Sequence, residues 1–285
     1  MVNLILTILF SSILFIVLKS FPKFKIDTFQ AIVFNYIIAF AVGLLNSEES
    51  LSVSKTIQKP WIWSCFFLGF LFIGVFFVIG KTAQKNGVSV ASVASKMSLV
   101  IPILFGIFYF KETFDNLKII GICIALVAVF FTTKKETIGI KSSNFIFPIL
   151  VFLGSGIIDT SMNFIQQKLV NTVDIALFSS LIFFMAFSIG SLLLIYLLVQ
   201  NQIKFQFKSI IGGVILGIPN YYSLYFLIHS LQDSQLQSAT IFTIINISVI
   251  LLTILFGLFL FKEKLRKHNY IGIILAIFAL YLVTY

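Results

Sequence analysis

Long apolar runs separated by short polar stretches make up nearly the whole chain. Most runs are about 20 residues long, the length of a helix that crosses a bilayer, and they lack the alternation of transmembrane barrel strands. The pattern predicts membrane-spanning helices over residues 2–19, 29–46, 61–80, 88–110, 116–133, 146–168, 174–200, 209–229, 235–261 and 269–284.

The second half of the chain repeats the first. Ile103–Phe131 and Ile254–Leu282 are offset by 151 residues and share 13 identities in 29 positions, Gly121/Gly272 among them. A repeat with five spans must insert its second copy upside down. The predicted fold is therefore an all-α membrane protein of ten transmembrane helices in two inverted five-helix repeats, residues 1–133 and 145–285, joined by a linker over 134–144.

Composition and charge agree with a membrane protein. The chain is 59% hydrophobic and 11% charged, with a mean hydropathy of +1.09, which excludes a soluble domain. The net charge of +10 comes from basic residues in short loops, so it indicates a lipid bilayer as partner and not a nucleic acid. The loops after odd-numbered spans hold 14 Lys and Arg against 5 in the others, which predicts that both termini lie outside the cytoplasm.

Two ionisable residues fall deep inside predicted spans. A charged side chain there is costly to insert into the membrane, so each of the two is a candidate functional residue. Asp159 lies in the middle of span 146–168 and is either a proton-coupling site, a counter-charge for a cationic substrate, or a neutral or Lys96-paired group that fixes packing. Lys96 lies in span 88–110 and either anchors a carboxylate or phosphate or extends along its own helix to water.

Uncharged polar residues form the second group of candidates. Pro219 removes a backbone donor from span 209–229, so Asn220, Tyr221 and Tyr225 either line a cavity at a helix break or form a kink within the core. The remaining candidates are Asn35, Tyr36, Ser92, Ser95, Asn163, Gln166 and Asn246. Asn163 and Gln166 share the helix face of Asp159 through i, i+4, i+7 spacing.

Other residues are assigned structural roles or none. Gly213 and Gly217 are predicted to let helix backbones approach closely, and the Lys262-Glu263 pair to hold the turn to the last helix. His229 and His268 have no Cys, His or acid at ligand spacing, so we expect neither a metal, a cofactor nor an enzyme site.

The end of each half reads as a membrane helix with a break, then Phe-Lys-Glu, a short polar turn and I-G-I-x-x-A. This pattern resembles the EamA domain of the drug/metabolite transporter superfamily. The resemblance implies a ten-helix transporter with both termini in the cytoplasm, against the lysine count. Related four-helix multidrug exporters carry a Glu about two turns before a Lys in their first helix; here Asp159 precedes Lys168 by nine residues, whereas the first span has Lys19 but no acid.

The sequence thus predicts a multi-pass protein of the bacterial plasma membrane that carries a small metabolite or drug by alternating access, with proton coupling through Asp159. The alternatives are an anion or metabolite exchanger anchored by Lys96 and a non-transporting membrane scaffold. The substrate, the coupling ion, the direction of transport and the oligomeric state are not encoded in any of these motifs.

Overall fold

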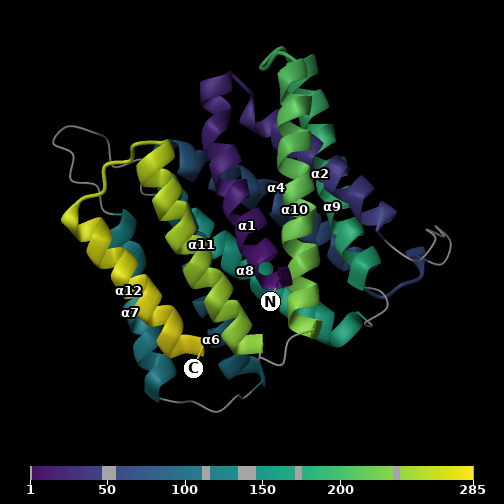
Figure 1. Cartoon of the computed structure of the whole chain (residues 1–285). Helices are drawn as coiled ribbons and strands as arrows, with labels where there is room; N and C mark the ends of the chain where they lie inside the picture. The colour runs from purple at the N-terminus through teal and green to yellow at the C-terminus, as the bar shows by residue number, and fades with distance from the viewer. Residues whose placement is uncertain are drawn as a thin grey trace. The chain divides into compact units, whose positions relative to one another are not determined.

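The computed structural model describes residues 2–46, 56–110, 116–133, 146–170, 175–233 and 238–284, and over these residues it is helical without strands (Figure 1). The helices are α1 (Val2–Ser20), the short η1 (Phe21–Phe24), α2 (Thr28–Leu45), α4 (Ile62–Lys85), α5 (Val88–Met97), α6 (Val100–Phe110), α7 (Asn116–Thr133), α8 (Ile146–Leu169), α9 (Ile175–Val199), α10 (Phe207–Asp233), α11 (Ser238–Leu260) and α12 (Lys267–Thr284). The all-α class is confirmed. The linker 134–144 lies outside the described residues.

The apolar runs become helices close to their predicted bounds. Among the described residues, six helical segments are long and apolar enough to cross a membrane: Val2–Phe24, Thr28–Leu45, Ile62–Lys85, Val88–Phe105, Leu177–Val199 and Phe207–Leu227. Four further apolar helical segments are shorter: Ile119–Thr132, Ile146–Met162, Ile244–Leu260 and Lys267–Leu282. The protein is therefore an integral, multi-pass membrane protein.

The span predicted over 88–110 is found as one apolar segment over Val88–Phe105, and the break expected in it divides the helix into α5 and α6 at Ser98 and Leu99. Pro102 has no backbone N–H, so the carbonyl of Ser98 cannot have its usual helical donor there. That carbonyl instead accepts from the Ile101 N–H at 2.9 Å, in a tighter turn. A break inside a span requires protein or water around the freed backbone groups.

Pro219, in contrast, does not break its helix. α10 is helical from Phe207 to Asp233 with Pro219 inside it. The turn before Pro219 is packed against α2, since a Cβ on Gly217 would lie 2.7 Å from the Asn35 carbonyl oxygen. A helix held by such a neighbour can lose one hydrogen bond and stay continuous.

The helices form two compact units. Unit 1 consists of residues 1–19, 78–157 and 222–285, and unit 2 of residues 20–77 and 158–221. These units do not coincide with the sequence repeats, because each draws segments from both halves of the chain. α4, α8 and α10 each contribute residues to both units.

Within unit 1, α7 packs on α12, the helix at the corresponding place in the other repeat (Figure 1). Their buried contact uses corresponding positions in both helices: Ile122/Ile273, Ala125/Ala276 and Ala128/Ala279. Asn269, at the start of α12, donates to the Thr132 carbonyl near the end of α7 at 2.8 Å, so the two helices run antiparallel. The small side chains allow this close approach.

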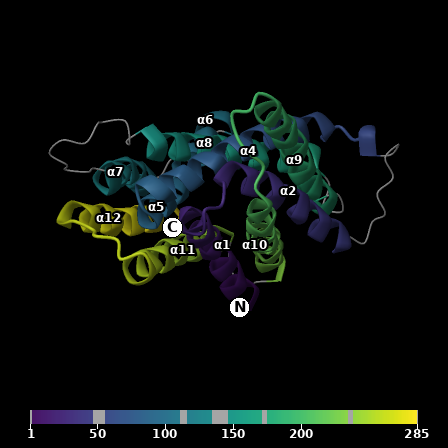
Figure 2. The same ribbon diagram turned by 90° about the horizontal axis from the view of Figure 1, so that it is seen from above.

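Two more pairs of corresponding helices lie side by side, each pair inside one unit (Figure 2). Their contacts show that both pairs are antiparallel. In unit 1, Ser92 in α5 contacts Thr253 in α11, and the earlier Ser89 lies beside the later Gly257. In unit 2, the end of α2 meets the start of α9, where Gly43 lies against Ser180. A helix and its counterpart thus point in opposite directions in all three pairs.

Candidate functional site

Two buried asparagines face each other in unit 2. The Asn220 Nδ2 atom of α10 donates to Asn35 Oδ1 of α2 at 3.2 Å, and Asn35 Nδ2 lies 3.5 Å from the Ile32 carbonyl oxygen. Asn35 is fully buried and Asn220 is 8% exposed. A buried amide is expensive to leave without partners, so this pair fixes the register of α2 against α10.

Glycines bring these two helices together. A Cβ on Gly213 would lie 3.0 Å from the Asn35 backbone nitrogen, and one on Gly217 would lie 2.8 Å from Ile38 Cβ. The predicted close approach at Gly213 and Gly217 is confirmed. Without it, the short asparagine side chains could not reach across the helix–helix contact.

The tyrosines next to these asparagines are also buried. The Tyr36 hydroxyl donates to the Phe72 carbonyl of α4 at 2.9 Å, and its ring stacks on Phe183 at a centroid distance of 6.0 Å. Tyr221 is 7% exposed and lies against Gly43 of α2. Unit 2 thus buries four uncharged side chains that can form hydrogen bonds: Asn35, Tyr36, Asn220 and Tyr221.

We expect Asn35→Ala to lower the free energy of unfolding by about 1–3 kcal/mol, because it removes the buried acceptor of the Asn220 amide. Thermal unfolding of the purified protein in detergent measures this change. The double variant Asn35→Ala/Asn220→Ala should lose less than the sum of the two single variants, since both amides are then gone. Additive losses would show that the two side chains do not depend on each other.

A row of hydroxyl groups on α5 forms a second polar cluster, in unit 1. Ser92, which is fully buried, accepts from Thr253 Oγ1 of α11 at 2.6 Å and donates to the Ser89 carbonyl at 3.0 Å. Ser95 lies 3.4 Å from the Ser155 hydroxyl of α8. The hydroxyls therefore join α5 to two other helices.

Thr253 and Ser155 were not among the residues predicted from the sequence. Thr253 stands at the position that corresponds to Pro102 in the first half, and it also hydrogen-bonds the Val249 carbonyl of its own helix at 2.8 Å. The sequence signal that could have identified Thr253 was the replacement of the corresponding proline by a residue with a hydroxyl group. Asn246, about two turns before Thr253 in α11, is buried as well.

Asp159 and Lys96 lie near the middle of α8 and in the last turn of α5, respectively. The Asp159 side chain lies on the exposed surface of the described helices, and Lys96 is half-buried. A cation in the last turn of a helix interacts favourably with the helix dipole. The side chains of Asn163 and Gln166, also on α8, lie outside the described part of the chain.

Partly exposed aromatic rings lie together in unit 1. Tyr225 is packed edge-to-face on Tyr222 at 6.1 Å and on His229 at 4.3 Å, and Tyr222 stacks on Phe10 of α1 at 5.8 Å. Tyr222 was not singled out from the sequence, although it lies next to Tyr221.

No group of three or more His, Cys, Asp or Glu residues that could hold a metal occurs among the described residues.

Comparisons with known proteins assign the chain to a family. The profile of the EamA-like transporter family matches residues 1–134 and again residues 146–285. An "Uncharacterized protein" of Haemophilus influenzae is 32% identical over 290 residues, which cover 99% of this chain and 97% of the relative. A "Putative sugar uptake protein" of Lactobacillus helveticus is 26% identical over 125 residues, 44% of this chain and 45% of the relative.

A solved crystal structure shares the fold, with a TM-score of 0.59 and 15% identity over 98% of both chains. The similarity to the Haemophilus protein is consistent with a bacterial inner-membrane location. With both halves matched by the same family profile, the chain belongs to the EamA-like transporter family.

Proposed function

We propose that this protein is a secondary transporter that moves a small polar solute across the membrane by alternating access of two inverted five-helix repeats. The observation that carries the proposal is the antiparallel packing of corresponding helices: α7 with α12, α5 with α11, and α2 with α9. Counterparts that point in opposite directions are what inverted repeats require. Membership of a transporter family supports the same function.

The polar side chains that the described helices bury inside each unit suggest a class of solute. Near the middle of their helices these are amides and hydroxyls, as in Asn35, Asn220, Ser92 and Thr253. Such groups can exchange their hydrogen bonds with one another for hydrogen bonds to solute hydroxyl groups. The Lactobacillus relative is named as a putative sugar uptake protein, and a sugar is a neutral solute rich in hydroxyl groups.

Asp159 is the coupling group in this proposal. It is an exposed carboxylate halfway along an apolar helix, and an acid at that depth is retained at a cost in insertion energy. A carboxylate that is protonated on one side of the membrane and deprotonated on the other couples proton flow to solute movement.

A second candidate function is exchange of anionic metabolites anchored by Lys96. This candidate is favoured by the position of Lys96 directly before the break between α5 and α6, because backbone groups freed by a break inside a span are compatible with a wet cavity. In that case the Lys96→Ala variant should lose affinity for the anion, whereas a substitution of Asp159 should leave that affinity unchanged.

Reconstitution in liposomes tests the proposed function. Sugars and sugar alcohols, amino acids, organic cations and sugar phosphates would each be tested for uptake with and without a pH gradient. We expect uptake of a neutral polyhydroxylated solute that responds to the pH gradient. Uptake of a sugar phosphate alone would support the second candidate, and no uptake of any class would favour a membrane scaffold.

A further inference from the structure

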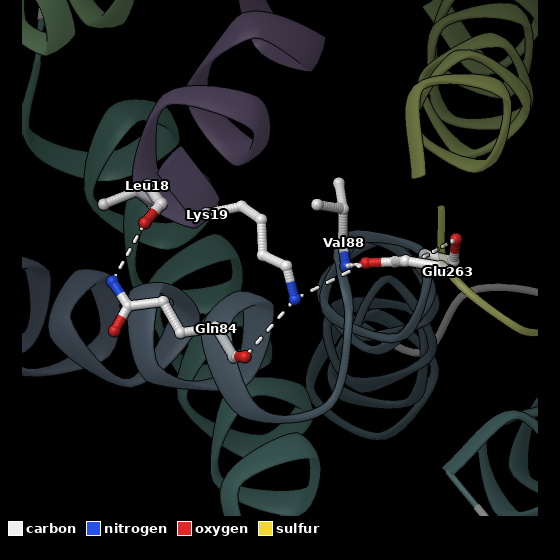
Figure 3. A network of polar contacts seen from close by, with 6 residues as sticks. Leu18, Lys19, Gln84, Val88 and Glu263 are labelled. Atoms are coloured by element: carbon white, nitrogen blue, oxygen red, sulfur yellow. Dashed lines mark hydrogen bonds and ion pairs between the residues drawn. The ribbon is translucent and has the colours of Figure 1, made fainter. Parts of the chain in front are cut away.

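Glu263, in the turn after α11, contacts the start of α5 instead of serving only its own turn. Its Oε1 atom accepts from the Val88 backbone N–H at 2.7 Å (Figure 3). Its Oε2 atom accepts from Ser89 Oγ at 3.1 Å. Two donors at the first turn of α5 are thereby satisfied by a carboxylate from the other half of the chain. The sequence prediction that Lys262 and Glu263 hold the turn to the last helix missed this contact.

The space around the carboxylate is left open by two glycines. A Cβ on Gly87 would lie 2.9 Å from Glu263 Oε2, and one on Gly257 would lie 2.7 Å from the same atom. Gly87 also has a φ of +115°, a conformation that residues with a side chain rarely adopt. A side chain at Gly257 would therefore displace the Glu263 carboxylate from this position, and one at Gly87 would in addition strain the backbone.

Lys19, at the end of α1, extends this contact to two more helix ends. Its Nζ atom lies 3.7 Å from Glu263 Oε1 and donates to the Gln84 carbonyl near the end of α4 at 3.3 Å. The Gln84 side chain in turn donates to the Leu18 carbonyl at 2.9 Å (Figure 3). The ends of α1 and α4, the start of α5 and the turn after α11 are thus joined at one place, within unit 1.

We propose that Glu263, with Lys19, Gln84 and the first turn of α5, forms an ionic latch that closes one end of unit 1 and has to open during the transport cycle. This role rests on the proposed transport function, because only a protein that changes conformation needs a contact that opens. The link joins segments 175 residues apart, so it connects the two repeats.

The contacts of the latch are suited to opening and closing. The ion pair is partly accessible, with the Lys19 and Glu263 side chains 19% and 11% exposed. Water can therefore replace each partner when the helix ends separate. The donors at the start of α5 are backbone and hydroxyl groups at a helix end, which water can satisfy as well.

Cysteine labelling tests the latch without knowledge of the solute. In a Cys65→Ala/Cys123→Ser background, Ala91→Cys places a reporter on α5, where Ala91 is fully buried. A water-soluble maleimide should react about tenfold faster with this reporter when Glu263→Gln or Lys19→Gln removes the charge-assisted contact. Lys19→Arg keeps the charge and should leave the reporter protected.

A control reporter distinguishes a latch from a purely structural cap. Ala276→Cys on α12 is equally buried, lies in the contact with α7, and should stay protected in every variant. If Ala276→Cys also becomes reactive, Glu263 stabilises the whole fold and the latch is overturned. Equal labelling of Ala91→Cys in all variants overturns it too. Absence of solute uptake by the wild type would instead refute the proposed function, and the labelling rates would still decide whether this end opens.

Discussion

Gly272→Leu is expected to prevent accumulation of folded protein. A side chain at this position would collide with the Thr132 hydroxyl, and its Cβ would lie 2.5 Å from the Thr132 backbone nitrogen and 2.9 Å from the Ala128 carbonyl oxygen. Backbone atoms cannot turn aside as a flexible side chain can, so α12 would have to move away from α7. The cost should reach or exceed about 3 kcal/mol, a large share of the stability of most proteins.

Size-exclusion chromatography of the detergent-solubilised protein measures this outcome as the height of the monodisperse peak. Gly74→Leu is the matched control, because nothing lies within 4 Å of a Cβ at Gly74 in α4. The control should give nearly the wild-type peak, since leucine is also a better helix former than glycine. A normal peak for Gly272→Leu would mean that α7 and α12 are not packed as described.

Asp159→Asn is expected to abolish proton-driven accumulation of the solute in liposomes while exchange of solute between the two sides continues. Asparagine has nearly the same size as aspartate but cannot bind and release a proton. Because Asp159 is exposed and not part of the packed interior, the variant should fold normally. The measurement is solute uptake driven by an imposed pH gradient, compared with uptake driven by a solute gradient alone.

Asp159→Glu is the conservative control and should retain uptake driven by the pH gradient. Asp27→Asn is a second control for loss of an acidic group: Asp27 caps the start of α2, where its side chain accepts from the Gln30 N–H at 2.9 Å. It should lower stability by about 1 kcal/mol or less without changing the response to pH, because asparagine also caps helices well. Undiminished proton-driven uptake by Asp159→Asn would refute the coupling role.

Glycine and polar residues allowed part of the packing to be predicted. Gly213 and Gly217 were expected to mark a close helix contact, and they do, against α2. Their spacing of four residues places both on one helix face, so the pattern is local and visible in the sequence. The amide pair next to them was not predictable as a pair, because Asn35 and Asn220 are 185 residues apart.

The two prolines show why local rules need the tertiary structure. Proline removes the same donor at positions 102 and 219, yet the first lies after a break between α5 and α6 and the second inside the continuous α10. The difference comes from the neighbours: α10 is held against α2 through Gly217, whereas the Ser98 carbonyl has the Ile101 N–H as an alternative donor.

The helices, their approximate ends, the membrane location and the duplication could all be predicted from the order of the residues. Each of these follows from the length of apolar runs and from identities at a constant offset, which are properties of adjacent residues or of direct comparison along the chain. Which side chains contact each other, in contrast, depends on how the helices pack in three dimensions. The partners of Glu263, which are Lys19, Val88 and Ser89, lie in the opposite half of the chain, and no local pattern specifies a contact over that distance.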